Sequence, residues 1–158
     1  LTGHLVRSTV HTNSAVAAIT RLRDMGIESF LLASSLKTII SQRLVRRLCS
    51  HCKNKQKISP ESAELFKLNK SQDVYYPVGC DHCNGTGYQG RIAIAECIQV
   101  DKKLKDLIHN SASENEISDY VFKDNHSIEQ ASVRLILDGV TSCEEIIRVN
   151  NIKEDASI

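Results

Sequence analysis

Two CxxC motifs close together constrain this chain more than any other feature of its sequence. The motifs are Cys49-Ser50-His51-Cys52 and Cys80-Asp81-His82-Cys83, and residues 53–79 separate them. Each motif lets two thiolates approach one metal ion at about 2.3 Å, and two motifs complete a tetrahedral shell. Because four thiolates leave no open coordination position, such a shell is structural rather than catalytic. We therefore predict that Cys49, Cys52, Cys80 and Cys83 bind one structural Zn²⁺.

Free thiols and disulfides are the alternatives to a metal site. Disulfides are rare in cytosolic proteins, and two CxxC pairs in one short region rarely arise by chance. His51 and His82 lie inside the motifs and could compete for the metal, although four thiolates already complete the shell. Cys97 and Cys143 have no cysteine nearby, so we expect both to be small buried apolar residues.

The segment between the motifs is longer than the spacing of about 15–20 residues that is usual in zinc ribbons. We therefore expect an insertion with a short helix of its own. Ser59 followed by Pro60 predicts where that helix begins, because Ser is favoured at the N-cap and Pro at the first helical position. Gly85 and Gly87 follow the second motif and predict a tight turn that brings backbone N–H groups onto sulfur.

Composition narrows the range of functions that this chain could perform. A hydrophobic fraction of 41% and a charged fraction of 25% are typical of soluble globular proteins. The net charge is only +1 and aromatic residues make up 4%, so neither general electrostatics nor base stacking favours direct contact with nucleic acid. No apolar run reaches the length of about 18 residues that spans a bilayer. The chain begins at Leu1 without the pattern of a signal peptide, which indicates a cut inside a larger protein.

Hydrophobic periodicity predicts a mixed α/β chain. We expect a strand over 3–11, a helix from Asn13 or Ser14 to Gly26, a helix over 29–48, a strand over 91–100, and several helices after 101. Glu96 falls on the apolar face of the second strand, so it is expected either to be paired or to mark the strand's end. Ser113 with Glu116 has the pattern of a capping box, as do Thr141 with Glu144 and Ser142 with Glu145. Gly139 has the pattern of a helix stop.

The first residues carry a resemblance to a known family. Residues 2–13, Thr2-Gly3-His4-Leu5-Val6-Arg7-Ser8-Thr9-Val10-His11-Thr12-Asn13, resemble the histidine box of the bacterial type II secretion and type IV pilus assembly ATPases. Residues 21–26, 30–36, 42–49 and 87–91 follow in the same order as in that family. The resemblance covers nearly the whole chain, although Arg7 stands where the family usually has an apolar residue.

This resemblance implies an α/β fold: the C-terminal part of a RecA-like nucleotide-binding domain with a four-cysteine zinc insertion and a helical C-terminal subdomain. It assigns 1–48 to the RecA-like core, 49–90 to the zinc insertion, and 91–158 to a strand and the helical subdomain. His4 and His11 would sense the γ-phosphate of ATP bound with Mg²⁺ in the complete protein. The implied partners are neighbouring subunits of a homo-hexamer and inner-membrane platform proteins, at the cytoplasmic face of that membrane.

The chain itself contains no phosphate-binding loop, because none of its seven glycines begins a GxxxxGK[ST] motif. We therefore expect no ATP hydrolysis from these 158 residues alone. Two alternatives remain. One is a stand-alone zinc-stapled module that binds protein or nucleic acid. The other is a zinc domain of the DnaJ co-chaperone type, whose CxxCxGxG repeat matches residues 80–87 but fails after the first motif.

Overall fold

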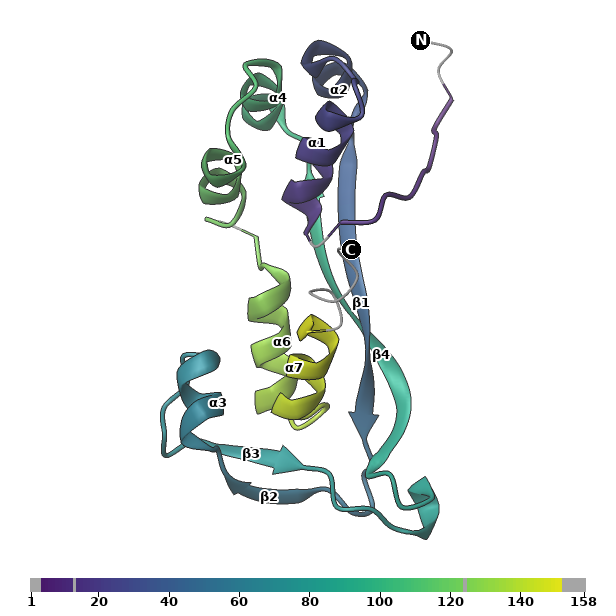
Figure 1. Cartoon of the computed structure of the whole chain (residues 1–158), viewed down its shortest axis with the longest axis vertical. Coiled ribbons are helices and arrows are strands. Elements are labelled where there is room, and N and C mark those ends of the chain that lie inside the picture. The colour runs from purple at the N-terminus through teal and green to yellow at the C-terminus, as the bar shows by residue number, and fades with distance from the viewer. Residues whose placement is uncertain (1–3, 13, 124, 152–158) are drawn as a thin grey trace. The chain divides into compact units, whose positions relative to one another are not determined.

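The computed structural model describes residues 4–12, 14–123 and 125–151 of this chain, and it combines helices with strands (Figure 1). The first half contains α1 (Ala15–Asp24), α2 (Ser29–Ser35), β1 (Thr38–Leu48), β2 (Asn54–Lys57), α3 (Pro60–Leu65) and β3 (Asp73–Tyr76). The second half contains the 3-10 turn η1 (Asp81–Cys83), β4 (Tyr88–Gln99), α4 (Lys102–His109), α5 (Glu114–Val121), α6 (Ile128–Leu137) and α7 (Cys143–Asn151). Within the described ranges, no helix is long and apolar enough to cross a bilayer.

The chain divides into two compact units, each with its own apolar core. Unit 1 comprises residues 1–41 and 96–125, and unit 2 comprises residues 42–95 and 126–158. Strands β1 and β4 pair in a two-stranded sheet, and each strand contributes residues to both units.

Unit 1 packs four helices around its part of the strands. Helix α2 packs against α4, and α1 packs against α5. The core consists of large aliphatic side chains that are at most 3% exposed, among them Ile19, Leu32, Ile98, Leu104, Ile108 and Ile117. Local capping defines where the helices begin: Ser14 Oγ accepts from the Ala17 amide, and Ser113 and Glu116 form a reciprocal capping box.

Unit 2 combines a small hairpin with three helices. Strands β2 and β3 pair antiparallel, with Asn54 opposite Tyr76 and Lys57 opposite Asp73. Helix α3 begins at Pro60 after the N-cap Ser59, as the sequence predicts. The core is again aliphatic and includes Val45, Ile58, Val74, Ile94, Ile136 and Ile146. These side chains come from β1, β3, β4, α6 and α7 and from the segment before α3, so the core holds these elements together.

The predicted helix over 29–48 is wrong in its second half. The helix ends at Ser35, and Thr38–Leu48 is strand β1. The β-branched run Thr38-Ile39-Ile40 favours a strand. Up to Val45, the side chains of β1 alternate between exposed and more buried positions, which is the period of a half-buried strand.

The expected strand over 3–11 is also wrong in its described part, because residues 4–11 have no regular secondary structure and are exposed. A strand needs a neighbour to complete its hydrogen bonds, and none of the described segments pairs with this one. The predicted strand 91–100 exists as part of the longer β4. Its buried face contains Ile94, Glu96 and Ile98, as the apolar pattern indicates.

Cys97 contradicts its prediction, since it lies on the exposed face of β4, whereas Cys143 is buried as expected. Gly26 and Gly139 both follow helices with positive φ values of 86° and 64°, which confirms the predicted stops. Beyond Asn151 the tail lies outside the described residues.

Candidate metal centre and ionic network

The structure brings the four motif cysteines together. Cys49 directly follows β1, Cys52 completes the same turn, and Cys80 and Cys83 lie at the ends of the short turn η1. The four Sγ atoms all lie within 4.8 Å of one another, and the four cysteines form no disulfide. The Sγ–Sγ distances are 3.9 Å for Cys49–Cys80, 3.8 Å for Cys52–Cys83 and 3.8 Å for Cys80–Cys83. A tetrahedron with metal–sulfur bonds of about 2.3 Å has edges of about 3.8 Å, so the cluster has the dimensions of a metal-thiolate shell.

Backbone amides support these sulfurs. The amides of Cys80 and Gly87 donate to Cys83 Sγ at 3.2 Å each, and the Gly79 amide donates to Cys52 Sγ at 3.3 Å. Gly87 has a φ of 76°, and a Cβ added there would lie 2.5 Å from Cβ of Pro77. This position therefore requires glycine, and its amide contacts sulfur as the sequence predicts.

These amides make the Cys83 thiol more acidic than an ordinary cysteine. Burial raises the pKa of the Cys83 thiol, but the donated amides of Cys80 and Gly87 stabilise the thiolate and bring its pKa down to about 6. Burial and hydrogen bonds from neighbouring thiols raise the pKa of Cys80 to about 11. A bound cation would favour the thiolate form of the cysteines that hold it.

His51 and His82 do not join the four sulfurs. Their rings stack on each other with centroids 4.0 Å apart and an interplanar angle of 18°. Both side chains are exposed. The two CxxC motifs are therefore also in contact through the stacked rings of these histidines, which lie outside the sulfur cluster.

One lysine connects the cysteine motifs to the helices of unit 2. Lys53 Nζ donates to the Gly139 carbonyl at 2.7 Å and lies 4.5 Å from the centre of the Tyr75 ring. A Cβ at Gly139 would fall 2.4 Å from that ring, so the turn between α6 and α7 fits closely against β3. The Leu48 amide donates to the carbonyl of Val140 in the same turn.

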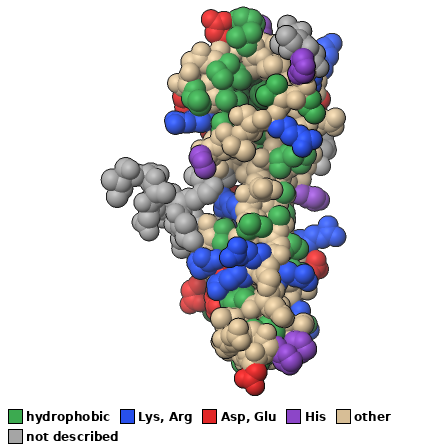
Figure 2. All heavy atoms as spheres, turned by 90° about the vertical axis from the view of Figure 1, so that its right-hand side faces the viewer, with side chains coloured by type: hydrophobic (Ala, Val, Ile, Leu, Met, Phe, Trp, Pro, Cys, Tyr) green, Lys and Arg blue, Asp and Glu red, His purple; other side chains and the backbone are tan. Residues whose placement is uncertain are grey.

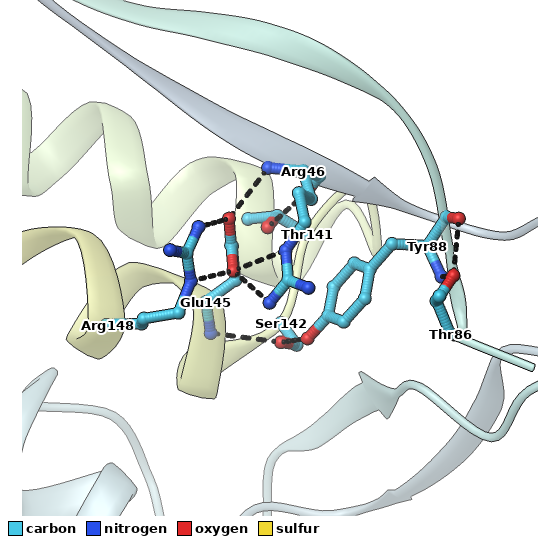
Figure 3. A network of polar contacts seen from close by, with 7 residues as sticks. All are labelled: Arg46, Thr86, Tyr88, Thr141, Ser142, Glu145 and Arg148. Carbon is cyan, nitrogen blue, oxygen red and sulfur yellow. Dashed lines mark hydrogen bonds and ion pairs between the residues drawn. The ribbon is translucent and has the colours of Figure 1, made fainter.

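A second polar cluster surrounds Glu145 in α7, a residue that the sequence indicated only as part of a capping box (Figure 3). The Ser142 hydroxyl does accept from the Glu145 amide, at 3.2 Å. The Glu145 carboxylate is fully buried, however, and accepts the Nε and Nη2 groups of both Arg46 and Arg148 at 2.6–2.9 Å. The spacing Glu145-x-x-Arg148 suits a helical pair, but no sequence signal joins either residue to Arg46, 99 positions away.

The two arginines determine the charge of this buried acid. Burial raises the pKa of Glu145, but the hydrogen bonds from Arg148 and Arg46 outweigh burial and lower it to about 2. The Arg46 guanidinium also lies 4.0 Å from the centre of the Tyr88 ring, and the Tyr88 hydroxyl shares a 2.7 Å hydrogen bond with Ser142. The side chain of Arg46 is therefore held from two sides.

The two predicted nucleotide-sensing histidines lie in unit 1, and both His4 and His11 are exposed. His11 stands three residues before Ser14, the N-cap of α1. The Ala15 amide at this helix end already donates to the carboxylate of Glu96, which is 1% exposed. This contact explains the acid on the buried face of β4.

Comparison with known proteins identifies relatives along nearly the whole chain. The family model described as "Type II/IV secretion system protein" matches residues 1–148. A putative type II secretion system protein E of Escherichia coli K12 is 47% identical over 151 residues, covering 94% of this chain and 31% of the relative. The type II secretion system ATPase E of Vibrio cholerae is 46% identical, covering 94% and 30%.

A type IV pilus assembly ATPase of Acinetobacter baylyi is 44% identical over 154 residues, covering 94% of this chain and 26% of the relative. The chain thus spans between 26% and 31% of the length of these curated relatives.

Proposed function

Because the chain belongs to the type II/IV secretion system protein family, we propose that it works as part of a hexameric ATPase that powers assembly of a type II secretion pseudopilus or a type IV pilus. The observation that carries this proposal is identity of 44–47% along 94% of the chain with proteins named for these systems, two of them as ATPases. The proposal places the protein in the cytoplasm, peripheral to the inner membrane, where it would meet assembly-platform proteins.

In this proposal, residues 1–48 belong to a RecA-like core, 49–90 form the zinc insertion, and 91–158 form a strand with a helical subdomain. The complete protein would hold ATP and Mg²⁺ through a phosphate-binding loop that these 158 residues lack. The role of His4 and His11 would be to register the γ-phosphate and couple it to subunit movement. Family membership supports this role, and the exposure of both side chains leaves them accessible to the rest of the protein.

For the metal, we propose Zn²⁺ bound by Cys49, Cys52, Cys80 and Cys83. The all-sulfur donor set and the tetrahedral dimensions of the cluster support zinc in a structural role. A shell of this kind gives the metal no position for substrate or water. It would hold the motif turns together and leave hydrolysis to other parts of the protein.

The catalytic part of the proposal is tested by ATP turnover of the complete protein. We expect His11→Ala to lower turnover about 10²-fold or more, which corresponds to roughly 3 kcal/mol of lost transition-state stabilisation. His109→Ala is the matched control, because His109 is an exposed histidine at the end of α4. Equal turnover of the two variants would show that His11 does not contribute to ATP hydrolysis and would leave it only a structural role.

A second test addresses the insertion as a docking element for platform proteins or neighbouring subunits. Glu64 and Lys70 are exposed residues of this segment with no ion pair among the described residues. We expect Glu64→Arg and Lys70→Glu to leave metal content and stability within about 0.5 kcal/mol of the wild type, yet to impair secretion or pilus assembly. Normal assembly by both variants would show that the insertion has no docking role and only stabilises the fold.

A further inference from the structure

Unit 2 contains a pocket that is walled mainly by arginines. Its volume is about 420 Å³, and it is lined by Leu44, Arg46, Arg91, Glu145 and Arg148. Leu44 and Arg46 come from β1, Arg91 from β4, and the other two from α7. Figure 2 shows a group of Lys and Arg side chains close together in the lower half of the face that it presents.

The pocket keeps an excess of positive charge after its internal ion pairs are counted. Glu145 is the one acid in the lining, and its buried carboxylate is already shared by Arg46 and Arg148. Arg91 forms no ion pair with any residue in the described ranges. Three guanidinium groups and one carboxylate therefore leave two uncompensated positive charges in the pocket.

Two of the three arginines in this pocket are held in place by the protein. Arg46 and Arg148 use Nε and Nη2 on Glu145, so their Nη1 groups have no hydrogen-bond partner among the described residues. The Tyr88 ring covers the Arg46 guanidinium, and Ser142 holds the Tyr88 hydroxyl. A ligand would thus meet side chains that have already lost most of their rotamer freedom, which reduces the entropic cost of binding.

We propose that this pocket binds a phosphate group. A phosphate carries a charge of about −1.5 to −2 near pH 7, which matches the excess of two positive charges. Planar guanidinium groups donate in pairs to phosphate oxygens, and a tetrahedral group can accept from three arginines at once. A single carboxylate has one charge and two oxygens and would leave part of this donor set unused. The proposal does not depend on the ATPase assignment.

The phosphate group could arrive free, as pyrophosphate, or on a nucleotide, and the shared chemistry is the phosphoryl oxyanion. The test is isothermal titration calorimetry on the complete protein at about 150 mM salt, with inorganic phosphate, pyrophosphate, ADP and citrate as probes. Arg91→Gln is the informative variant, because Arg91 has no ion pair to lose. Arg134→Gln is the matched control, since Arg134 is exposed on α6, 4.0 Å from Asp138, and does not line the pocket.

We expect saturable binding of phosphate or pyrophosphate that Arg91→Gln weakens about tenfold or more and Arg134→Gln leaves unchanged. The thermal midpoint of Arg91→Gln should match the wild type. If an ADP-binding event separate from the one at the phosphate-binding loop weakens in parallel, the group arrives on a nucleotide, and if only the inorganic probes are affected, it arrives free. Wild-type affinity in Arg91→Gln, an equal loss in Arg134→Gln, or citrate binding as tightly as pyrophosphate would overturn the proposal.

Discussion

Replacing Glu145 by Gln should destabilise unit 2 strongly, although the change is conservative in shape. The carboxylate is fully buried and accepts five N–H groups, four from the guanidinium groups and one from the Arg46 amide. Gln has nearly the same shape but supplies one acceptor oxygen, and its NH₂ group faces donors. The two arginines would then lie beside a neutral side chain without their counter-charge.

Two estimates of the loss in unfolding free energy caused by Glu145→Gln agree. Lowering the pKa of Glu145 from 4.5 to about 2 corresponds to about 3 kcal/mol, at 1.36 kcal/mol per pKa unit. Removing one partner of a buried ion pair typically costs about 3–5 kcal/mol. The side chains of Arg46 and Arg148 are 40% and 47% exposed and stay partly hydrated, so the lower end of that range applies. We expect Glu145→Gln to lose about 3 kcal/mol at pH 7.

Urea unfolding followed by circular dichroism measures this loss, with Glu144→Gln as control. Glu144 is the neighbouring exposed acid in the first turn of α7, and its replacement should cost less than about 0.5 kcal/mol. A loss below about 1 kcal/mol in Glu145→Gln, or equal losses in the two variants, would refute the reasoning.

The same experiment has a pH dependence. Because the folded-state pKa of Glu145 is depressed, its contribution is complete above pH 4.5 and disappears as the pH falls towards about 2. The stability difference between wild type and Glu145→Gln should therefore be constant from neutral pH down to this range and shrink below it. Acid also releases thiolate-bound metal, but it does so in both proteins, so the difference isolates the carboxylate.

Three further outcomes follow from local geometry. The purified chain should contain about one zinc per molecule by elemental analysis, and Cys80→Ser should lose the metal while replacement of the exposed Cys97 by Ser keeps it. Gly139→Ala should destabilise by about 1–3 kcal/mol in thermal unfolding, and by more than Gly26→Ala, because only at Gly139 does the new Cβ collide with the Tyr75 ring. Ser127→Ala should cost about 1 kcal/mol through loss of the α6 capping box, and a change within error would contradict that role.

Local signals in the sequence were sufficient for the helix starts and for the metal centre. A serine followed by its capping partner depends on residues within one turn, so Ser59, Ser113 and Ser142 could be identified without tertiary information. The cysteine spacing works in the same way, because each CxxC forms one local turn. Bringing the two turns together is a tertiary event, and the structure places all four Sγ atoms within 4.8 Å of one another.

The sequence-based predictions fail where apolar residues fit both helical and strand spacing, or where the interaction partner of a residue lies far away in the sequence. Between Ser35 and Leu48 the apolar residues fit helical spacing, yet the β-branched residues and the pairing of β1 with β4 favour a strand. The sequence shows that Glu96 is an acid on an apolar strand face. It does not show what pairs with this acid, because the Ala15 amide that donates to it lies 81 positions away. The Arg46–Glu145 pair spans 99 positions, and nothing local to either residue indicates it.

The interleaving of the two units limits how this protein can be divided. Residues 1–41 and 96–125 build one core, while 42–95 and 126–158 build the other, so the chain passes between the cores three times. No uninterrupted stretch of the sequence encodes either core alone. A fragment ending near residue 125 would contain all four motif cysteines but would lack α6 and α7, and with them Ile136, Ile146 and Gly139, the acceptor for Lys53. Limited proteolysis between 96 and 125 should therefore loosen both cores at once, and separate expression of either unit requires joining its two segments by a new linker.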